Sequence, residues 1–259
     1  MAANAQDAIM LFGDSITQGG WEDGGFGARL SHVYARKFDV LNRGLSGYNS
    51  EWAVPVFEQY FAKQHEQKHA PKIRLLTIWL GANDACIKPS PQHIPLEKYI
   101  ANLKHLVDMV RSPDSAWYSP DTAIILITPP PVNTHQRRAD LQARDPPKEL
   151  DRLFDTTKSY ADAVVKLGAG LQVPVVDIWN GLWDATGHEE TALSRYLRDG
   201  LHLNAAGYSI LYDLLMATIV KHVPTLDPSK LRDAIPRWDE INWDDPHPSI
   251  VKRDVQIPQ

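Results

Sequence analysis

The sequence of 259 residues has a single cysteine, Cys86, so no disulfide can form within the chain. Such a composition is typical of reducing compartments. The first apolar run, Ala8–Phe12, is far shorter than the ~20 residues that span a membrane, and no basic residues precede it as they would in a signal peptide. The carboxyl end has no lipidation or sorting signal. We therefore expect a cytoplasmic protein without a stable membrane anchor.

Dense basic tracts are also missing. The chain has 27 lysines and arginines against 32 acidic residues, which gives a formal charge of −5. This balance argues against a nucleic-acid partner. The 43% hydrophobic and 23% charged contents are ordinary for a globular protein, and a chain of this length buries most of its apolar surface. A homodimer is left open.

Short apolar runs alternate with longer segments of helical periodicity. The predicted strands are Ala8–Phe12, Phe38–Asn42, Ile73–Leu80, Thr122–Thr128 and Val173–Ile178. Three of these runs are almost unbroken apolar sequences, which is typical of parallel strands buried on both faces. Pro174 is tolerated near a strand start or at a sheet edge, so the fifth strand is expected at the periphery.

The segments between the strands have the apolar spacing of amphipathic helices. The predicted helices are Gly27–Lys37, Ser50–His65, Leu96–Val110, Glu149–Leu167 and Ala205–His222. Alternation of strands and helices predicts right-handed crossovers and an α/β fold, a three-layer sandwich around a doubly wound parallel sheet.

Two segments fall outside this alternation. Residues 129–148, rich in proline and arginine, are expected to form a long functional or mobile loop. We expect one domain over residues 1–222 and a tail over residues 223–259 that packs on the same domain. Trp238 and Trp243 are expected to anchor that tail, since disordered segments seldom contain tryptophan.

Four short polar motifs follow predicted strands or precede the last helix. They are Gly13-Asp14-Ser15, Gly44-Leu45-Ser46-Gly47, Gly81-Ala82-Asn83-Asp84 and Asp199-Gly200-Leu201-His202. In an open parallel sheet, ligands bind outside the carboxyl ends of the strands. The order and placement of the motifs therefore predict one site at that edge.

Three of these residues match the needs of nucleophilic catalysis. A serine hydroxyl such as that of Ser15 requires an adjacent base, and the imidazole of His202 titrates near neutrality. Asp199, three residues earlier in the same turn, is placed to hold the imidazole and stabilise its charged form. Acyl transfer also needs hydrogen-bond donors for the oxyanion. The backbone N–H groups of Ser15 and Gly47 and the side-chain amide of Asn83 are the candidates.

These motifs resemble those of the GDSL or SGNH hydrolase superfamily, in which Ser15, Gly47, Asn83 and His202 match the four named residues and Asp199 matches the acid. The runs around Gly47, Asn83 and His202 are more narrowly similar to the isoamyl acetate-hydrolysing esterase branch. The resemblance implies a flavodoxin-like fold with five strands in the order 2-1-3-4-5. It also implies hydrolysis of short-chain carboxylic esters, with a small-molecule ester as substrate and no cofactor or metal.

Several neighbouring residues have simpler interpretations. Asp14 and Asp84 are expected to hold turns, and Gly44 to permit a positive φ. Ser46 lies in a near match to a nucleophile elbow that lacks the second glycine. Cys86 is expected to be a small buried hydrophobic residue.

Four further residues receive structural interpretations. Arg137 and Arg138 are expected to be solvated loop charges rather than substrate anchors. Trp179 and Trp183, after the fifth strand, are expected to pack in the interior rather than to form the wall of a pocket.

Three other functions are compatible with parts of the sequence. An acyltransferase would use the same serine, histidine and aspartate. A metallophosphoesterase would need several His and Asp ligands around two metals, and the Gly-Asp and Gly-Ala-Asn motifs here are not followed by histidine. A non-catalytic binding protein would usually have lost one of the three catalytic residues.

Overall fold

A computed structural model describes residues 6–255. Five parallel strands form one sheet in the order β2-β1-β3-β4-β5. The strands are β1 (Ala8–Asp14), β2 (Asp39–Leu45), β3 (Ile73–Trp79), β4 (Ala123–Ile127) and β5 (Val175–Val176). The α/β class, the parallel sheet and the strand order are confirmed.

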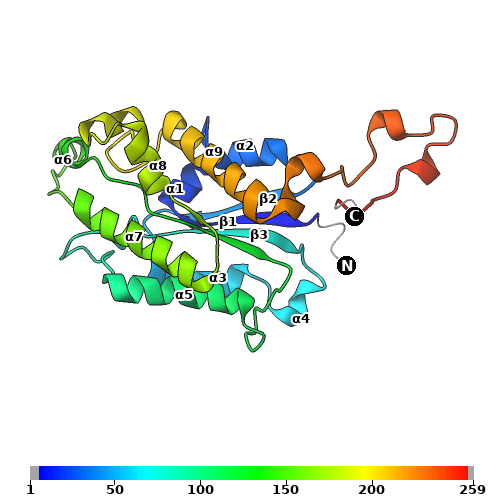
Figure 1. Cartoon of the computed structure of the whole chain (residues 1–259), viewed down its shortest axis with the longest axis horizontal. Helices are drawn as coiled ribbons and strands as arrows, with labels where there is room; N and C mark the ends of the chain where they lie inside the picture. Colours follow the sequence, from blue (N-terminus) through cyan, green and yellow to red (C-terminus); the bar gives the residue numbers. More distant parts are fainter. Residues whose placement is uncertain (1–5, 256–259) are drawn as a thin grey trace.

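Helices cover both faces of the sheet (Figure 1). Because side chains alternate along a strand, Ile9 and Leu11 of β1 face one layer and Met10 and Phe12 face the other. The first layer contains α2 (Phe26–Val33), α8 (Ile178–Ala185) and α9 (Ala205–His222). The second contains α3 (Ser50–Tyr60), α5 (Leu96–Arg111) and α7 (Phe154–Leu171). Two apolar cores, one on each face, hold the sandwich together.

The remaining helices are short. They are α1 (Ser15–Gln18), α4 (Gln64–Gln67), α6 (Thr134–Gln142) and the 3₁₀ helices Gly19–Trp21, Thr191–Arg195, Pro224–Leu226, Pro228–Lys230, Trp238–Glu240 and His247–Ser249. No helix within residues 6–255 combines the length and the apolar character needed to cross a lipid bilayer.

The structure differs from the sequence-based expectation after β4. The segment expected to be a long loop contains α6, which begins after Asn133, whose side chain accepts a hydrogen bond from the Gln136 N–H. The fifth strand is also shorter than expected. Asp177 ends it by capping α8, because its side chain accepts the Asn180 N–H.

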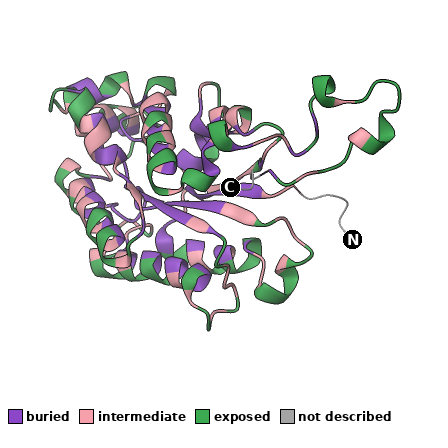
Figure 2. Cartoon of the chain, turned by 45° about the vertical axis from the view of Figure 1, so that its right-hand side comes forward, coloured by how far each residue is buried: buried purple, intermediate pink, exposed green. Residues whose placement is uncertain are grey.

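The carboxyl-terminal tail is divided between core and solvent. Leu226, Leu231 and Val255 are buried in the apolar core that also contains residues of α2, α8 and α9. Between them, residues 235–251 form an arm that projects from the body and is largely exposed (Figures 1 and 2). Trp238 and Trp243 lie on this arm with 68% and 74% of their surface exposed. The two rings lie beside each other, with their centroids 6.0 Å apart. The prediction that these tryptophans anchor the tail to the body is therefore wrong.

Candidate active site

Ser15 lies at a tight transition from strand to helix. It is the first residue of α1, directly after the last residue of β1, and the preceding Asp14 caps the helix by accepting the Ile16 N–H at 2.9 Å. Gly13 has no space for a side chain, because a Cβ there would lie 2.2 Å from Thr17 Oγ1. This turn therefore presents the Ser15 hydroxyl at the carboxyl edge of the sheet.

The structure brings Ser15 together with His202 and Asp199. Ser15 Oγ lies 2.9 Å from His202 Nε2, and His202 Nδ1 lies 2.8 Å from Asp199 Oδ2. An ionised carboxylate only accepts hydrogen bonds, so Nδ1 carries a proton. In the neutral imidazole Nε2 is then the acceptor, and the serine hydroxyl donates to it.

The turn around Asp199 keeps this carboxylate ionised. Its Oδ1 accepts the backbone N–H groups of Leu201 and His202 at 3.0 and 2.8 Å. Burial opposes ionisation, but the hydrogen bonds that the carboxylate accepts from the His202 ring and from the backbone outweigh it and hold the pKa of Asp199 well below its usual range. The guanidinium of Arg137 donates to Oδ2 at 3.1 Å. Asp199 is therefore a fixed anion behind the imidazole.

Gly47 and Asn83 follow the two strands that flank β1. Gly47 has a φ of +81°, a conformation that favours glycine. The Asn83 side chain is 3% exposed, and its Nδ2 donates to Tyr48 O at 2.8 Å. Its Oδ1 accepts from Arg152 Nη2 at 2.7 Å. Because arginine only donates, this contact assigns the amide orientation, with Oδ1 toward Arg152 and Nδ2 toward Tyr48 O.

The surrounding acids and glycines act structurally. Asp84 accepts the Ser50 N–H at 2.9 Å, and burial raises its pKa to about 6. Burial likewise raises the pKa of Asp14 to about 7. Gly44 has no positive φ, so that expectation is wrong. Glycine is needed there because a Cβ would lie 2.0 Å from the backbone nitrogen of Gln18.

A hollow of about 600 Å³ opens in front of Ser15 and His202. The other lining residues are Gln18, Gly19, Trp21, Glu22, Ser46 and Arg198. Arg198 and Glu22 form an ion pair at 2.7 Å. Ser46 is held by its N–H, which donates to Gln18 Oε1 at 2.9 Å. Most of the lining residues are therefore polar or charged, and Trp21 is the one large aromatic residue among them.

Trp179 and Trp183 lie outside this hollow, as predicted. Trp179 is 1% exposed and packs against Phe154 with ring centroids 5.1 Å apart, and Trp183 contacts the same phenylalanine at 4.8 Å. Cys86 is buried and is a free thiol, also as predicted.

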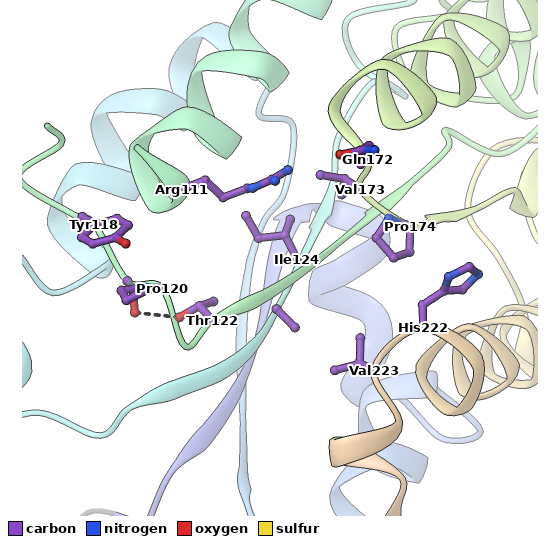
Figure 3. Close-up of a pocket in the computed structure, with 12 residues that line it drawn as sticks. Arg111, Tyr118, Pro120, Thr122, Ile124, Gln172, Val173, Pro174, His222 and Val223 are labelled. Atoms are coloured by element: carbon purple, nitrogen blue, oxygen red, sulfur yellow. Dashed lines mark hydrogen bonds between the residues drawn. The ribbon is translucent and has the colours of Figure 1, made fainter. Parts of the chain in front are cut away.

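Another hollow, of about 370 Å³, lies at the opposite edge of the sheet (Figure 3). It is lined by the start of β4, by residues just before β5 and by the ends of α5, α7 and α9. Arg111 Nη1 donates to Leu171 O at the end of α7 at 2.6 Å, and His222 lies at the end of α9. Basic groups at helix carboxyl ends are stabilising. These charges therefore have a structural explanation away from Ser15.

Two arginines near the site were not predicted. Arg137 is 4% exposed, so its assignment as a solvated loop charge is wrong, whereas Arg138 is exposed. Arg152, which sequence reasoning did not single out, is 2% exposed. The sequence shows that Asp151 and Arg152 are neighbours in the chain. It gives no sign that Asp151 binds Arg137 or that Arg152 binds Asn83.

Among residues 6–255, no three His, Cys, Asp or Glu side chains are grouped so that they could hold a metal ion. The histidine and aspartates near Ser15 instead have hydrogen-bond partners within the protein.

The sequence is similar to those of known lipases and esterases. Residues 11–210 match the model of the GDSL-like lipase/acylhydrolase family. The chain is 35% identical to the human isoamyl acetate-hydrolyzing esterase 1 homolog over 94% of this chain and 91% of that protein. It is 31% identical to the isoamyl acetate-hydrolyzing esterase of Saccharomyces cerevisiae over 91% of this chain and 95% of that protein.

Solved structures share the fold. A lipase/acylhydrolase from Enterococcus faecalis superimposes with a TM-score of 0.60 at 23% identity, covering 83% of this chain and 95% of the other. An acetylxylan esterase from Geobacillus stearothermophilus gives 0.59 at 19% identity, covering 85% and 96%. At these identities the likeness concerns the fold alone.

Proposed function

Because the chain belongs to the GDSL-like lipase/acylhydrolase family and is a carboxylic ester hydrolase, we propose that it cleaves short-chain esters through an acyl-enzyme on Ser15. The observation that carries this proposal is the continuous pair of hydrogen bonds from Ser15 Oγ through His202 to Asp199. That order gives a nucleophile, a base and a group that fixes the base.

In the first half of the reaction, Ser15 Oγ attacks the ester carbonyl while its proton passes to His202 Nε2. The carbonyl π electrons move to oxygen, which becomes an oxyanion. The imidazolium is stabilised by the Asp199 carboxylate. Collapse of the intermediate breaks the bond to the alkoxy group, which takes the proton from Nε2 and leaves as the alcohol.

In the second half, water occupies the position of the departed alcohol. His202 takes a proton from the water as it attacks the acyl carbonyl, which gives a second oxyanion. Collapse of this intermediate breaks the bond between the acyl carbon and Ser15 Oγ, and Oγ takes the proton back from His202 Nε2. The products are the carboxylic acid and the free enzyme. An alcohol in place of water would give a new ester, so the same residues also support acyl transfer.

The oxyanion is assigned to the edge between β1, β2 and β3. The proposed donors are the Ser15 N–H, the Gly47 N–H and an N–H of the Asn83 amide. Preorganised donors of this kind supply about 3–4 kcal/mol each to the transition state. The positive φ of Gly47 and the fixed orientation of Asn83 support this assignment.

For the substrate, we propose acetate and other short-chain esters, with isoamyl acetate as the reference compound. The names of the human and yeast relatives support this choice. A hydrolysis series from acetyl to octanoyl p-nitrophenyl esters tests it, and kcat/KM should fall steeply as the acyl chain lengthens. Equal kcat/KM values across the series would contradict the proposal. We also propose that the enzyme acts in the cytoplasm, which the single buried cysteine supports.

The decisive test of the mechanism compares two serines that line the same hollow. Ser15→Ala should lower kcat for p-nitrophenyl acetate on the order of 10⁶-fold, because the nucleophile is lost. Ser46→Ala should retain kcat within severalfold. Substantial turnover by the Ser15→Ala enzyme would overturn the proposal.

A further inference from the structure

Arg137 connects the aspartate of the site to a second acid. Its Nη1 donates to Asp199 Oδ2 at 3.1 Å, while Nε and Nη2 donate to the two oxygens of Asp151 at 3.1 and 2.9 Å. It lies on α6, whose first turn packs on Gly200, since a Cβ at that glycine would lie 2.4 Å from Arg137 N. A buried guanidinium is therefore held against the turn that carries Asp199 and His202.

Arg152 continues this contact toward Asn83. Its Nη1 donates to Asp151 Oδ2, and its Nη2 donates to Asn83 Oδ1 at 2.7 Å. The same guanidinium donates from Nε to Ala82 O at 2.7 Å. Arg152 therefore donates hydrogen bonds both to the side chain of Asn83 and to the backbone carbonyl of the preceding residue.

The four charged groups alternate in sign from Asp199 through Arg137 and Asp151 to Arg152. The two arginines are 4% and 2% exposed. Burial opposes ionisation of Asp151, but its bonds to Arg137 and Arg152 hold its pKa below the usual range. Buried ion pairs commonly contribute little net stability, so stability alone is a weak explanation for this arrangement.

On the basis of the proposed function, we infer that Arg137, Asp151 and Arg152 form a positioning bridge that fixes the Asn83 amide relative to the His202–Asp199 pair. The base and the oxyanion donor lie on separate loops, and the bridge joins these loops through the protein interior. None of the three residues lines the hollow in front of Ser15, so their effect on the reaction is exerted through Asn83 and Asp199.

The consequence for the reaction is geometric. An oxyanion donor acts when it lies about 2.7–3.1 Å from the developing charge, and a displacement of about 1 Å can cost on the order of 10²-fold in rate. Arg152 also prevents rotation of the Asn83 amide, because a flipped amide would place its NH₂ group against the guanidinium. Loss of Arg152 should therefore lower kcat while leaving KM nearly unchanged.

A double-mutant cycle tests this inference with p-nitrophenyl acetate. Asn83→Ala should lower kcat by about 10²–10³-fold, and Arg152→Met by about 10–10²-fold. If Arg152 acts through Asn83, the double variant should be within about threefold of Asn83→Ala alone, since coupled residues are not additive. A multiplied loss in the double variant would overturn the inference.

The role of Asp151, which joins the two arginines of the bridge, is tested separately. Asp151 contacts the two arginines rather than Asn83 or Asp199, yet Asp151→Asn should lower kcat at least several-fold with KM within about twofold. An unchanged kcat would overturn the bridge. Arg138→Met is the matched control, because Arg138 is the exposed neighbour of Arg137 on α6, and its kcat should equal that of the wild type.

Folding defects and failure of the proposed function give different results. Each variant is checked by its thermal unfolding midpoint, and if Arg152→Met does not fold, the cycle is run with Arg152→Lys, which retains the charge but not the fork of donors. If Arg152 only supported the fold, Arg152→Met would lower kcat by the same factor in the wild type and in the Asn83→Ala variant. If Asn83→Ala itself has full activity, the proposed oxyanion role fails. If it is impaired but additive with Arg152→Met, only the bridge fails.

Discussion

Replacement of Asp199 by asparagine exchanges one oxygen for an NH₂ group in a setting where every neighbour is a donor. Oδ1 accepts two backbone N–H groups, those of Leu201 and His202, at 3.0 and 2.8 Å. The remaining amide oxygen is therefore expected to stay there, which places the new NH₂ group opposite His202 Nδ1 and Arg137 Nη1. The arginine cannot lose its proton, so the imidazole must adapt.

The imidazole can accept from the new amide only if Nδ1 gives up its proton. The neutral ring then carries its proton on Nε2, the nitrogen that faces Ser15 Oγ at 2.9 Å. In that tautomer it cannot accept the serine proton. The same exchange of tautomer in a serine protease triad costs about 10⁴-fold in kcat, and we expect a loss of this size in Asp199→Asn.

The assay is the steady-state kcat for p-nitrophenyl acetate at pH 7.5, with thermal unfolding as a check on the fold. Asp162→Asn is the control, since Asp162 pairs with Lys158 on the surface of α7 and should leave kcat unchanged. An Asp199→Asn enzyme that is folded and keeps a tenth of the wild-type kcat would refute the assigned tautomer and the role of Asp199.

Three further predictions concern stability, each measured by urea unfolding. Burial raises the pKa of Asp14 from 3.8 to about 7. Relative to Asp14→Asn, the wild type should therefore lose stability as pH rises from about 4 to 7. The free energy of unfolding of Asp14→Asn minus that of the wild type should increase by about 3 kcal/mol between pH 5 and pH 8. A difference that does not change with pH would contradict the burial argument. Gly44→Ala should destabilise by about 1–3 kcal/mol, because its Cβ would meet the Gln18 backbone at 2.0 Å, whereas Gly170→Ala, with open space around it, should be neutral or stabilising by up to about 1 kcal/mol. Trp238→Ser should change stability by less than about 0.5 kcal/mol because the ring is exposed, and a larger loss would show that the arm supports the fold.

Local patterns were sufficient to predict most of the fold. The buried strands read as apolar runs, and the segment after the fifth strand, Ala205–His222, was predicted as a helix with the observed bounds. The candidate site residues were predicted because each follows a strand or precedes a helix at one edge of the sheet. What periodicity could not show was α6, a short polar helix whose start depends on the cap at Asn133.

The environment of charged residues could not be read from local patterns. Arg137 looked like a solvated charge, because its partner Asp199 lies 62 residues away and only the fold brings them together. The link from Arg152 to Asn83 spans 69 residues. For Trp238 the error has the opposite sign, since its apolar character suggested burial although 68% of its surface is exposed. In each case the tertiary structure, and not the residue type, decided the exposure.

The central claim, that Ser15 carries the acyl group, is tested most directly by trapping the intermediate. The enzyme is mixed with p-nitrophenyl acetate, quenched in acid within the first turnover, and digested for peptide mass mapping. We predict a mass gain of one acetyl group on the peptide at Ser15, and no such gain in Ser15→Ala. Acetylation at Ser46 instead, or hydrolysis in which rapid quenching traps no acetylated serine, would contradict the account.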